Sequence, residues 1–257
     1  MRVSYLPVLG TLRELYQQPR TMQRFRAYLD KLTGGTDDIV LPIGVANPMA
    51  KEQALGKLDE LLALDAEHIG AQAAEEAARR LASVPGEVEI KAALVLVDDV
   101  GGGWTNRYTT EAMVRFPGRG ALKRPFANGL VWTSESPSAE ELRQEVLAAI
   151  YRVAYQQRRG LPATLPAMLD QEGLAGVFAG ARPSLRDHAL RAAREIIHPH
   201  LEPQAKATYP TAFACLYGDE AATELGYQPL GLPARAGFAV ALADALDQQR
   251  DPVAALL

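Results

Sequence analysis

The sequence has little of what disulfide-stapled proteins and metalloproteins need. Its 257 residues include one cysteine and four histidines. A single cysteine excludes an intramolecular disulfide and a thiolate metal cluster, which fits a reducing compartment. Cys215 lies in the apolar run 212–216, so we interpret it as a small buried hydrophobe rather than a nucleophile. A chain of this length buries enough surface to fold without a staple.

Long apolar runs and a strong positive charge are absent as well. No stretch approaches the roughly 20 apolar residues of a membrane span, and the first residues lack the core of a signal peptide. The formal net charge of −4 argues against nucleic acid as a partner, because phosphate contact demands a basic surface. We therefore expect a soluble cytoplasmic protein that contacts neither a membrane nor nucleic acid.

Known catalytic and cofactor motifs are also missing. The glycine run Gly101 to Gly103 does not follow the dinucleotide pattern G-x-G-x-x-G, and no lysine follows it as a P-loop requires. The sequence has no G-x-S-x-G elbow and no H-E-x-x-H zinc motif. His198 and His200 form the one close histidine pair, but spacing fixes no third ligand. The sequence therefore offers no nucleotide motif and leaves any cofactor unknown, and we predict no stoichiometric transition metal at the histidine pair.

What the sequence does contain is one strong β pattern, residues 87–116. Apolar residues alternate from Val88 to Leu96, and a second alternation runs from Tyr108 to Phe116. We interpret the two limbs as an antiparallel hairpin, with a third short strand at 129–133. The sequence predicts an α+β fold, mainly helical, with a small antiparallel sheet of about three strands.

Helical spacing covers most of the remaining chain. Residues 6–33 predict a helix interrupted at Pro19, and residues 49–84 predict a longer one that breaks near Leu64-Asp65 or Gly70. A capping box at Ser138 to Glu141 predicts a helix that ends near Arg159. Further helices are predicted in the remainder of the chain.

The domain organisation follows from the same pattern. We expect a single domain over residues 1–257, because no linker separates its parts. Its subregions are a helical one at 1–84, the hairpin and sheet at 85–136, and a second helical one at 137–257.

The connection between the two predicted strands, residues 98–107, is longer than the roughly 2 to 5 residues that a hairpin needs. Its polar and aromatic side chains are the candidate functional residues: Asp98, Asp99 and Arg107 for acid–base chemistry, and Trp104, Thr105 and Asn106 for binding. The structural alternative is that the aspartates end the strand by turn chemistry, that Arg107 pairs with one of them across the ladder, and that Trp104 covers the core. If the tip is exposed, we expect Asp99→Ala and Asn106→Ala to change stability by under ~0.5 kcal/mol.

Three hypotheses about function remain open at this stage. The leading one is a binding or interaction protein whose tip 98–107 contacts a small polar ligand or a protein partner. The second is an enzyme that uses Asp98 or Asp99 as acid or base in a pocket between the sheet and helix 138–159. The third is a structural subunit without a ligand, and the sequence does not fix an oligomeric state.

Overall fold

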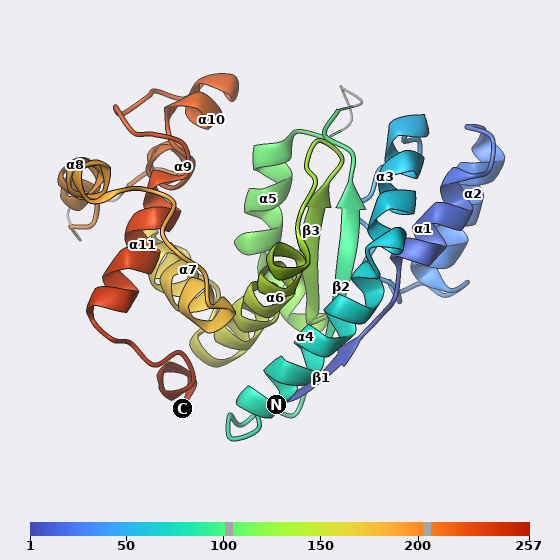
Figure 1. Ribbon diagram of the computed structural model, residues 1–257, viewed down its shortest axis with the longest axis horizontal. Helices are drawn as coiled ribbons and strands as arrows, with labels where there is room; N and C mark the ends of the chain where they lie inside the picture. The colour runs from blue at the N-terminus through green and yellow to red at the C-terminus, as the bar shows by residue number, and fades with distance from the viewer. Residues whose placement is uncertain (101–104, 203–206) are drawn as a thin grey trace. The chain divides into compact units, whose positions relative to one another are not determined.

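A computed structural model describes residues 1–100, 105–202 and 207–257, and Trp104 and the glycine run lie outside the described residues (Figure 1). The elements are β1 (Arg2–Tyr5), α1 (Leu9–Tyr16), α2 (Met22–Thr33), α3 (Glu52–Ala63), α4 (Ala66–Arg80), β2 (Glu89–Val97), α5 (Arg107–Arg115), η1 (Arg119–Lys123), β3 (Phe126–Trp132), α6 (Ala139–Arg159), α7 (Leu165–Ala179), α8 (Asp187–Ile197), η2 (His198–His200), α9 (Tyr209–Tyr217), α10 (Asp219–Glu224), α11 (Ala236–Asp247) and η3 (Ala254–Leu256).

The contacts divide the chain into two compact units, Met1–Ala154 and Tyr155–Leu257. The first unit holds the whole sheet, and the second is built from helices. The predicted single domain with its three subregions stays a prediction.

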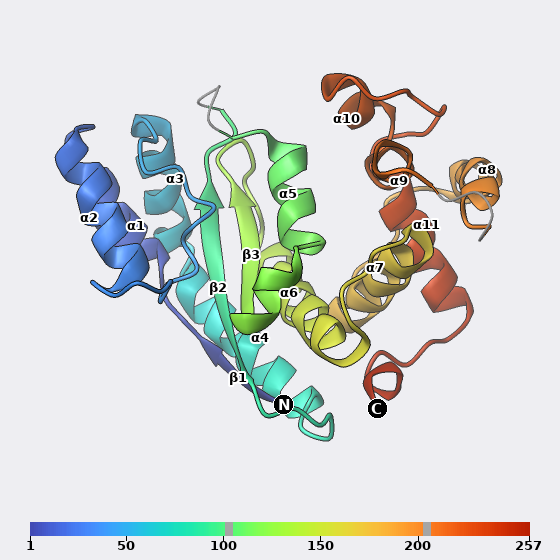
Figure 2. The same cartoon turned by 180° about the vertical axis from the view of Figure 1, so that it is seen from behind.

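The sheet has the strand order β1-β2-β3, and both pairings are parallel. Tyr5 pairs with Ala92 in one register, and Val97 pairs with Trp132 in the other. The prediction of an antiparallel sheet is therefore wrong. Each neighbouring pair is joined by helical crossovers, as parallel strands require, and Figures 1 and 2 show all three strands side by side.

The predicted return limb of the hairpin is the helix α5. The alternation that suggested a strand skips position 110, so Tyr108, Ala112 and Phe116 are in fact spaced by four residues, which is a helical interval. Glu111 and Arg115 form a buried i,i+4 ion pair of 2.7 Å on this helix. The predicted third strand exists, but it runs from Phe126 to Trp132, parallel to β2.

The two faces of the sheet are covered by different helices. Val97, Leu130 and Trp132 lie on one face, where Val114 of α5 and Val45 of the loop before α3 pack against them. This places α5 over the carboxyl-terminal half of β3.

The opposite face contacts α4 and α6. The Tyr5 ring lies against Gly70 of α4, where an added Cβ would come within 2.5 Å of it. At Gly129 an added Cβ would meet Leu94 at 3.1 Å and the Glu145 side chain of α6 at 3.5 Å. Glycine at these two positions permits the close packing of both helices on the strands.

Two helix boundaries predicted from the sequence are confirmed. The helix over 49–84 breaks between α3 and α4, where Asp65 adopts a left-handed backbone with φ 61°. The capping box at α6 is formed, since the Ser138 N–H donates to Glu141 at 2.7 Å and the Glu141 N–H donates to the Ser138 hydroxyl at 3.3 Å. Gly160, with φ 87°, follows the last residue of α6.

The second unit has an aromatic core around α9. The rings of Phe213 and Tyr217 stack at 4.5 Å, and Phe238 of α11 meets Tyr217 edge to face at 5.0 Å. Cys215 is fully buried here, and burial raises the pKa of its thiol to about 11. This agrees with its interpretation as a small core residue rather than a nucleophile.

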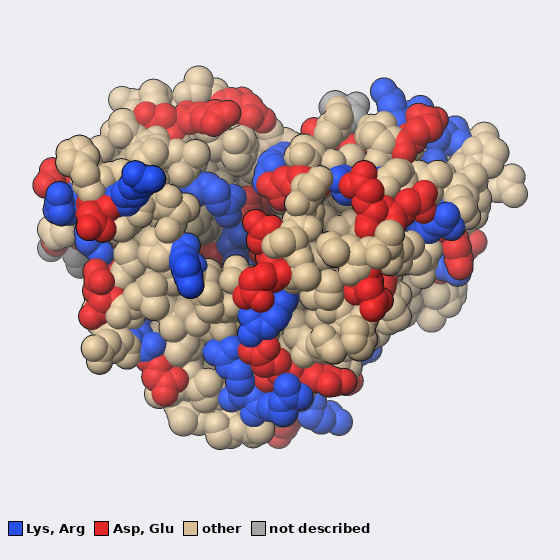
Figure 3. All heavy atoms as spheres, viewed as in Figure 1, with Lys and Arg blue, Asp and Glu red and all other residues tan. Residues whose placement is uncertain are grey.

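Among the described residues, no helix is both long and apolar enough to cross a membrane. On the face shown in Figure 3, lysine and arginine side chains are interspersed with aspartate and glutamate side chains.

Candidate functional site

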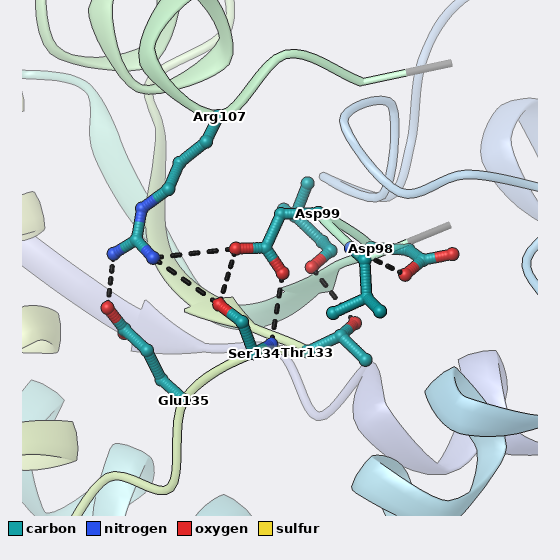
Figure 4. A network of polar contacts seen from close by, with 8 residues as sticks. Asp98, Asp99, Arg107, Thr133, Ser134 and Glu135 are labelled. Atoms are coloured by element: carbon teal, nitrogen blue, oxygen red, sulfur yellow. Dashed lines mark hydrogen bonds and ion pairs between the residues drawn. The ribbon is translucent and has the colours of Figure 1, made fainter. Parts of the chain in front are cut away.

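The candidate site lies where β2 and β3 end. Asp98 and Asp99 follow β2 directly, and Thr133, Ser134 and Glu135 follow β3. Because the strands are parallel, their carboxyl ends meet at the same edge of the sheet, which is the usual place for ligands in open α/β sheets. Figure 4 shows Asp99, Ser134 and Glu135 gathered around Arg107, whereas the Asp98 carboxylate points away from them.

Asp99 is the centre of the network. Its carboxylate accepts the Ser134 backbone N–H at 3.0 Å and the Ser134 hydroxyl at 2.6 Å. The Arg107 guanidinium donates to the same carboxylate at 3.4 Å. With a side chain only 7% exposed, Asp99 is held in one orientation by both strand ends and by α5.

Arg107 is the first residue of α5, so the helix start fixes where its side chain begins. Its guanidinium forms an ion pair with Glu135 and lies 4.9 Å from the centre of the Trp132 ring. It also donates to the Ser134 hydroxyl at 3.4 Å. An ion pair between Arg107 and one of the two aspartates is what the structural alternative predicts, although the residues meet across a strand-to-helix loop rather than a hairpin. An acid–base role for Asp99 and Arg107 stays a prediction.

Asp98 points to the other side of the strand end and is only 4% exposed. One carboxylate oxygen accepts the Val100 backbone N–H at 3.3 Å, and the other accepts from the Gln53 amide of α3 at 3.4 Å. The first contact is an Asx-type turn that ends the strand. These partners of Asp98 differ from the partners of Asp99 described above.

A buried pair beyond Asp98 was not identified from the sequence. The Arg24 guanidinium of α2 lies 4.6 Å from the centre of the Tyr16 ring and donates to the Ala50 carbonyl at 2.8 Å. The Tyr16 hydroxyl is buried and has no hydrogen-bond partner in the part of the chain that the structure describes. Burial raises the pKa of this hydroxyl, Arg24 lowers it, and the charge of Asp98 contributes to the rise.

Lys57 lies one turn beyond Gln53 on α3. Its ammonium donates to the Ser136 hydroxyl at 3.1 Å and forms an ion pair with Glu60. The lysine side chain is 10% exposed, so it ties α3 to the segment after β3. The sequence does not identify Lys57 as a residue near the site, because a lysine at this position is typical of an ordinary helix surface.

Two of the predicted binding residues lie at the start of α5. The Asn106 side chain caps the helix, accepting the Thr109 N–H at 2.9 Å and the Thr109 hydroxyl at 3.2 Å. Thr105 is half-buried beside it. Asn106 therefore has a structural task, and a role of Trp104 in binding stays a prediction.

The predicted histidine pair lies in the second unit, in the short turn η2. His198 is exposed and His200 is half-buried. Within residues 1–100, 105–202 and 207–257, no group of three or more His, Cys, Asp or Glu side chains is placed to hold a metal ion.

Comparison of the chain with known protein families, with curated proteins and with solved structures gives no match.

Proposed function

We propose that this protein binds a small polar ligand at the carboxyl ends of β2 and β3. The observation that carries the proposal is the network of Asp99, Arg107 and Ser134, which come from the loop after β2, the start of α5 and the loop after β3 at this edge of a parallel sheet. Loops at such an edge are the ones that a rigid scaffold presents for binding. The segment after β2 was predicted to be a hairpin tip, but it leads from a strand to the helix α5. We propose the same binding role for it.

The charges of the site favour a ligand that donates hydrogen bonds. Asp98, Asp99 and Glu135 bring three carboxylates to the edge, and Arg107 brings one guanidinium. Lys57 is close by but is paired with Glu60. Carboxylates only accept hydrogen bonds, so the excess of acceptors suits hydroxyl and ammonium groups, as in amino sugars, polyamines and polyols.

Preorganisation supports a binding role for Asp99. Its orientation is set by the Ser134 N–H and hydroxyl and by Arg107, so little rotamer freedom remains for a ligand to remove. A side chain that is already ordered loses less entropy when it binds.

A thermal-shift screen tests the proposal with two matched panels, one of small amines and polyols and one of small carboxylates and phosphates. A ligand at about 100 times its Kd stabilises the native state by about 2.7 kcal/mol, which is readily measured. We expect hits in the first panel, and we expect Asp98→Asn to weaken them at least about tenfold.

The control is Asp37→Asn, which removes an exposed carboxylate outside the site. It should leave the affinity unchanged. Hits confined to the anionic panel, or hits that Asp98→Asn and Ser134→Ala leave untouched, would contradict the proposal. If neither panel gives a hit and a partner protein binds instead, the site is an interaction surface. If nothing binds, the result favours the hypothesis of a structural subunit without a ligand.

A second candidate function is acid–base catalysis by Asp98. Its burial favours this role, and so does the interaction by which the charge of Asp98 contributes to the raised pKa of the Tyr16 hydroxyl. A buried carboxylate and a phenol are suitable groups for proton transfer. The test is to follow any bound ligand by NMR and mass spectrometry over time. Chemical change that Asp98→Asn abolishes while binding persists would establish an enzyme, and an unchanged ligand would leave a binding protein.

A further inference from the structure

The second unit contains a pocket of its own, with a volume of about 330 Å³. Its walls come from α7, α8, η2 and α11, all within Tyr155–Leu257. Ligand pockets in proteins span about 300 to 1,000 Å³, so this one suits a small molecule. The pocket lies far along the chain from Asp98 and Asp99 and takes no part in the function proposed above.

Apolar side chains line the body of the pocket, among them Leu169, Ile197, Leu201 and Val240. The α7 and α11 backbones approach closely at Gly173, where an added Cβ would lie 2.4 Å from the Ala241 carbonyl oxygen. The wall is therefore built from two helices in direct backbone contact, which leaves it little freedom to collapse.

The charged groups in the lining cancel in pairs. Arg194 donates to Asp244 at 2.7 Å, and Arg250 forms an ion pair with Asp170. Tyr155 also donates to Asp170 at 2.7 Å. Two guanidinium groups and two carboxylates thus face the pocket already matched.

Matched pairs decide the charge of the ligand. An anion would have to compete with an aspartate for its arginine, and a cation would have to compete with an arginine for its aspartate. Either ligand would also be carried into apolar surroundings, which disfavours an unpaired charge. An uncharged molecule with an apolar body meets neither obstacle.

Two polar side chains remain to orient such a molecule. His198 of η2 and Gln248 after α11 both line the pocket and are exposed at its mouth. An imidazole and an amide can each donate or accept a hydrogen bond, so they fit a hydroxyl or a carbonyl group.

We infer that this pocket is a second binding site, for a small uncharged molecule with an apolar body and one hydroxyl or carbonyl group. His198 serves there as a hydrogen-bonding residue rather than as a metal ligand.

Three probes with the same ring system test the inference: 1-naphthol, 1-naphthoate and 1-naphthylmethylamine. They carry a neutral, an anionic and a cationic group on one apolar body. In ligand-detected NMR titrations of the full chain at pH 7, we expect 1-naphthol to bind at least about tenfold more tightly than either charged probe. Equal or tighter binding of a charged probe would overturn the inference, as would no binding of 1-naphthol.

Variants locate the site. Leu169→Trp should fill the pocket and weaken 1-naphthol at least about tenfold, and Gln248→Trp at the exposed mouth provides a second blocking variant if the first does not fold. The matched control is Leu246→Trp, which places the same ring on an exposed position of α11 that does not line the pocket.

His198→Ala provides the chemical control. It should weaken 1-naphthol about threefold or more and leave naphthalene, which has no hydroxyl, unaffected. If 1-naphthol binds equally to wild type and to both blocking variants, the site lies elsewhere and the inference fails. Self-association that Leu169→Trp abolishes would assign the pocket to a second copy of the chain and would also overturn it.

Discussion

Replacing Asp99 with alanine tests the network at the carboxyl ends of β2 and β3. The Asp99 carboxylate accepts the N–H and the hydroxyl of Ser134, at 3.0 and 2.6 Å, and the Arg107 guanidinium at 3.4 Å. Its side chain is 7% exposed. A hydrogen bond to a charged group contributes about 1.5–3 kcal/mol to stability, so the variant loses more than an exposed loop residue would.

The structure narrows this magnitude. Ser134 is exposed, so water can replace part of what its N–H and hydroxyl lose, and Arg107 keeps its ion pair with Glu135. Counting one strong bond in full and the other two as largely replaced gives a loss of about 2 kcal/mol for Asp99→Ala. Asp99→Asn keeps one acceptor oxygen for the Ser134 N–H and should lose about 1 kcal/mol.

Urea denaturation followed by circular dichroism measures these losses as shifts of the transition midpoint. The matched control is Glu135→Ala, which removes the exposed partner of the same guanidinium and should change the unfolding free energy by under about 1 kcal/mol. If Asp99→Ala lost no more than Glu135→Ala, the network would be an ordinary surface ion pair and our reasoning would be refuted. The exposed-tip interpretation of the sequence, with its limit of ~0.5 kcal/mol, would then be restored.

Three further predictions concern other parts of the chain. Asn106→Ala removes the cap of α5 and should lower the unfolding free energy by about 1 kcal/mol, while Asn106→Asp should keep it within a few tenths; equal midpoints for all three proteins would contradict the capping role. Gly173→Ala should lower the midpoint of the second unit, because its methyl would lie 2.4 Å from a carbonyl oxygen of α11, whereas Gly176→Ala, which meets only a leucine side chain, should be milder. Burial raises the pKa of the Glu67 carboxyl above its ordinary value of 4.5, so the contribution of this carboxyl to stability is full below pH 4.5 and is lost as pH rises through the raised pKa. The unfolding free energy of wild type minus that of Glu67→Gln should therefore fall over this pH range, and a constant difference would exclude the linkage.

The sequence identifies those residues of the candidate site that lie close to one another along the chain. Two aspartates directly after a long buried strand indicate a polar strand end whatever the neighbouring strands do, and Asp98 and Asp99 lie there. Arg107 was grouped with them because it is close in sequence, and it does reach Asp99. The capping box of α6 and the break before α4 were predictable for the same reason, since helix caps and breaks depend on a few adjacent residues.

Tertiary features were not accessible in this way. Strand β1 has only four residues, Arg2–Tyr5, which is too short for a period-two pattern to distinguish it from the start of a helix. The burial of Arg24 over Tyr16 depends on how α1 and α2 pack, and an arginine on an amphipathic helix is otherwise read as a surface residue.

The error in strand direction also explains which site residues escaped notice. An antiparallel hairpin would bring the two limbs around the tip together and would leave the end of the third strand unassigned at either edge. In the parallel sheet the carboxyl end of β3 must lie at the same edge as that of β2, with Val97 paired to Trp132. Ser134 and Glu135 therefore join Asp99 from 35 and 36 positions along the chain, and strand direction alone decides that they do.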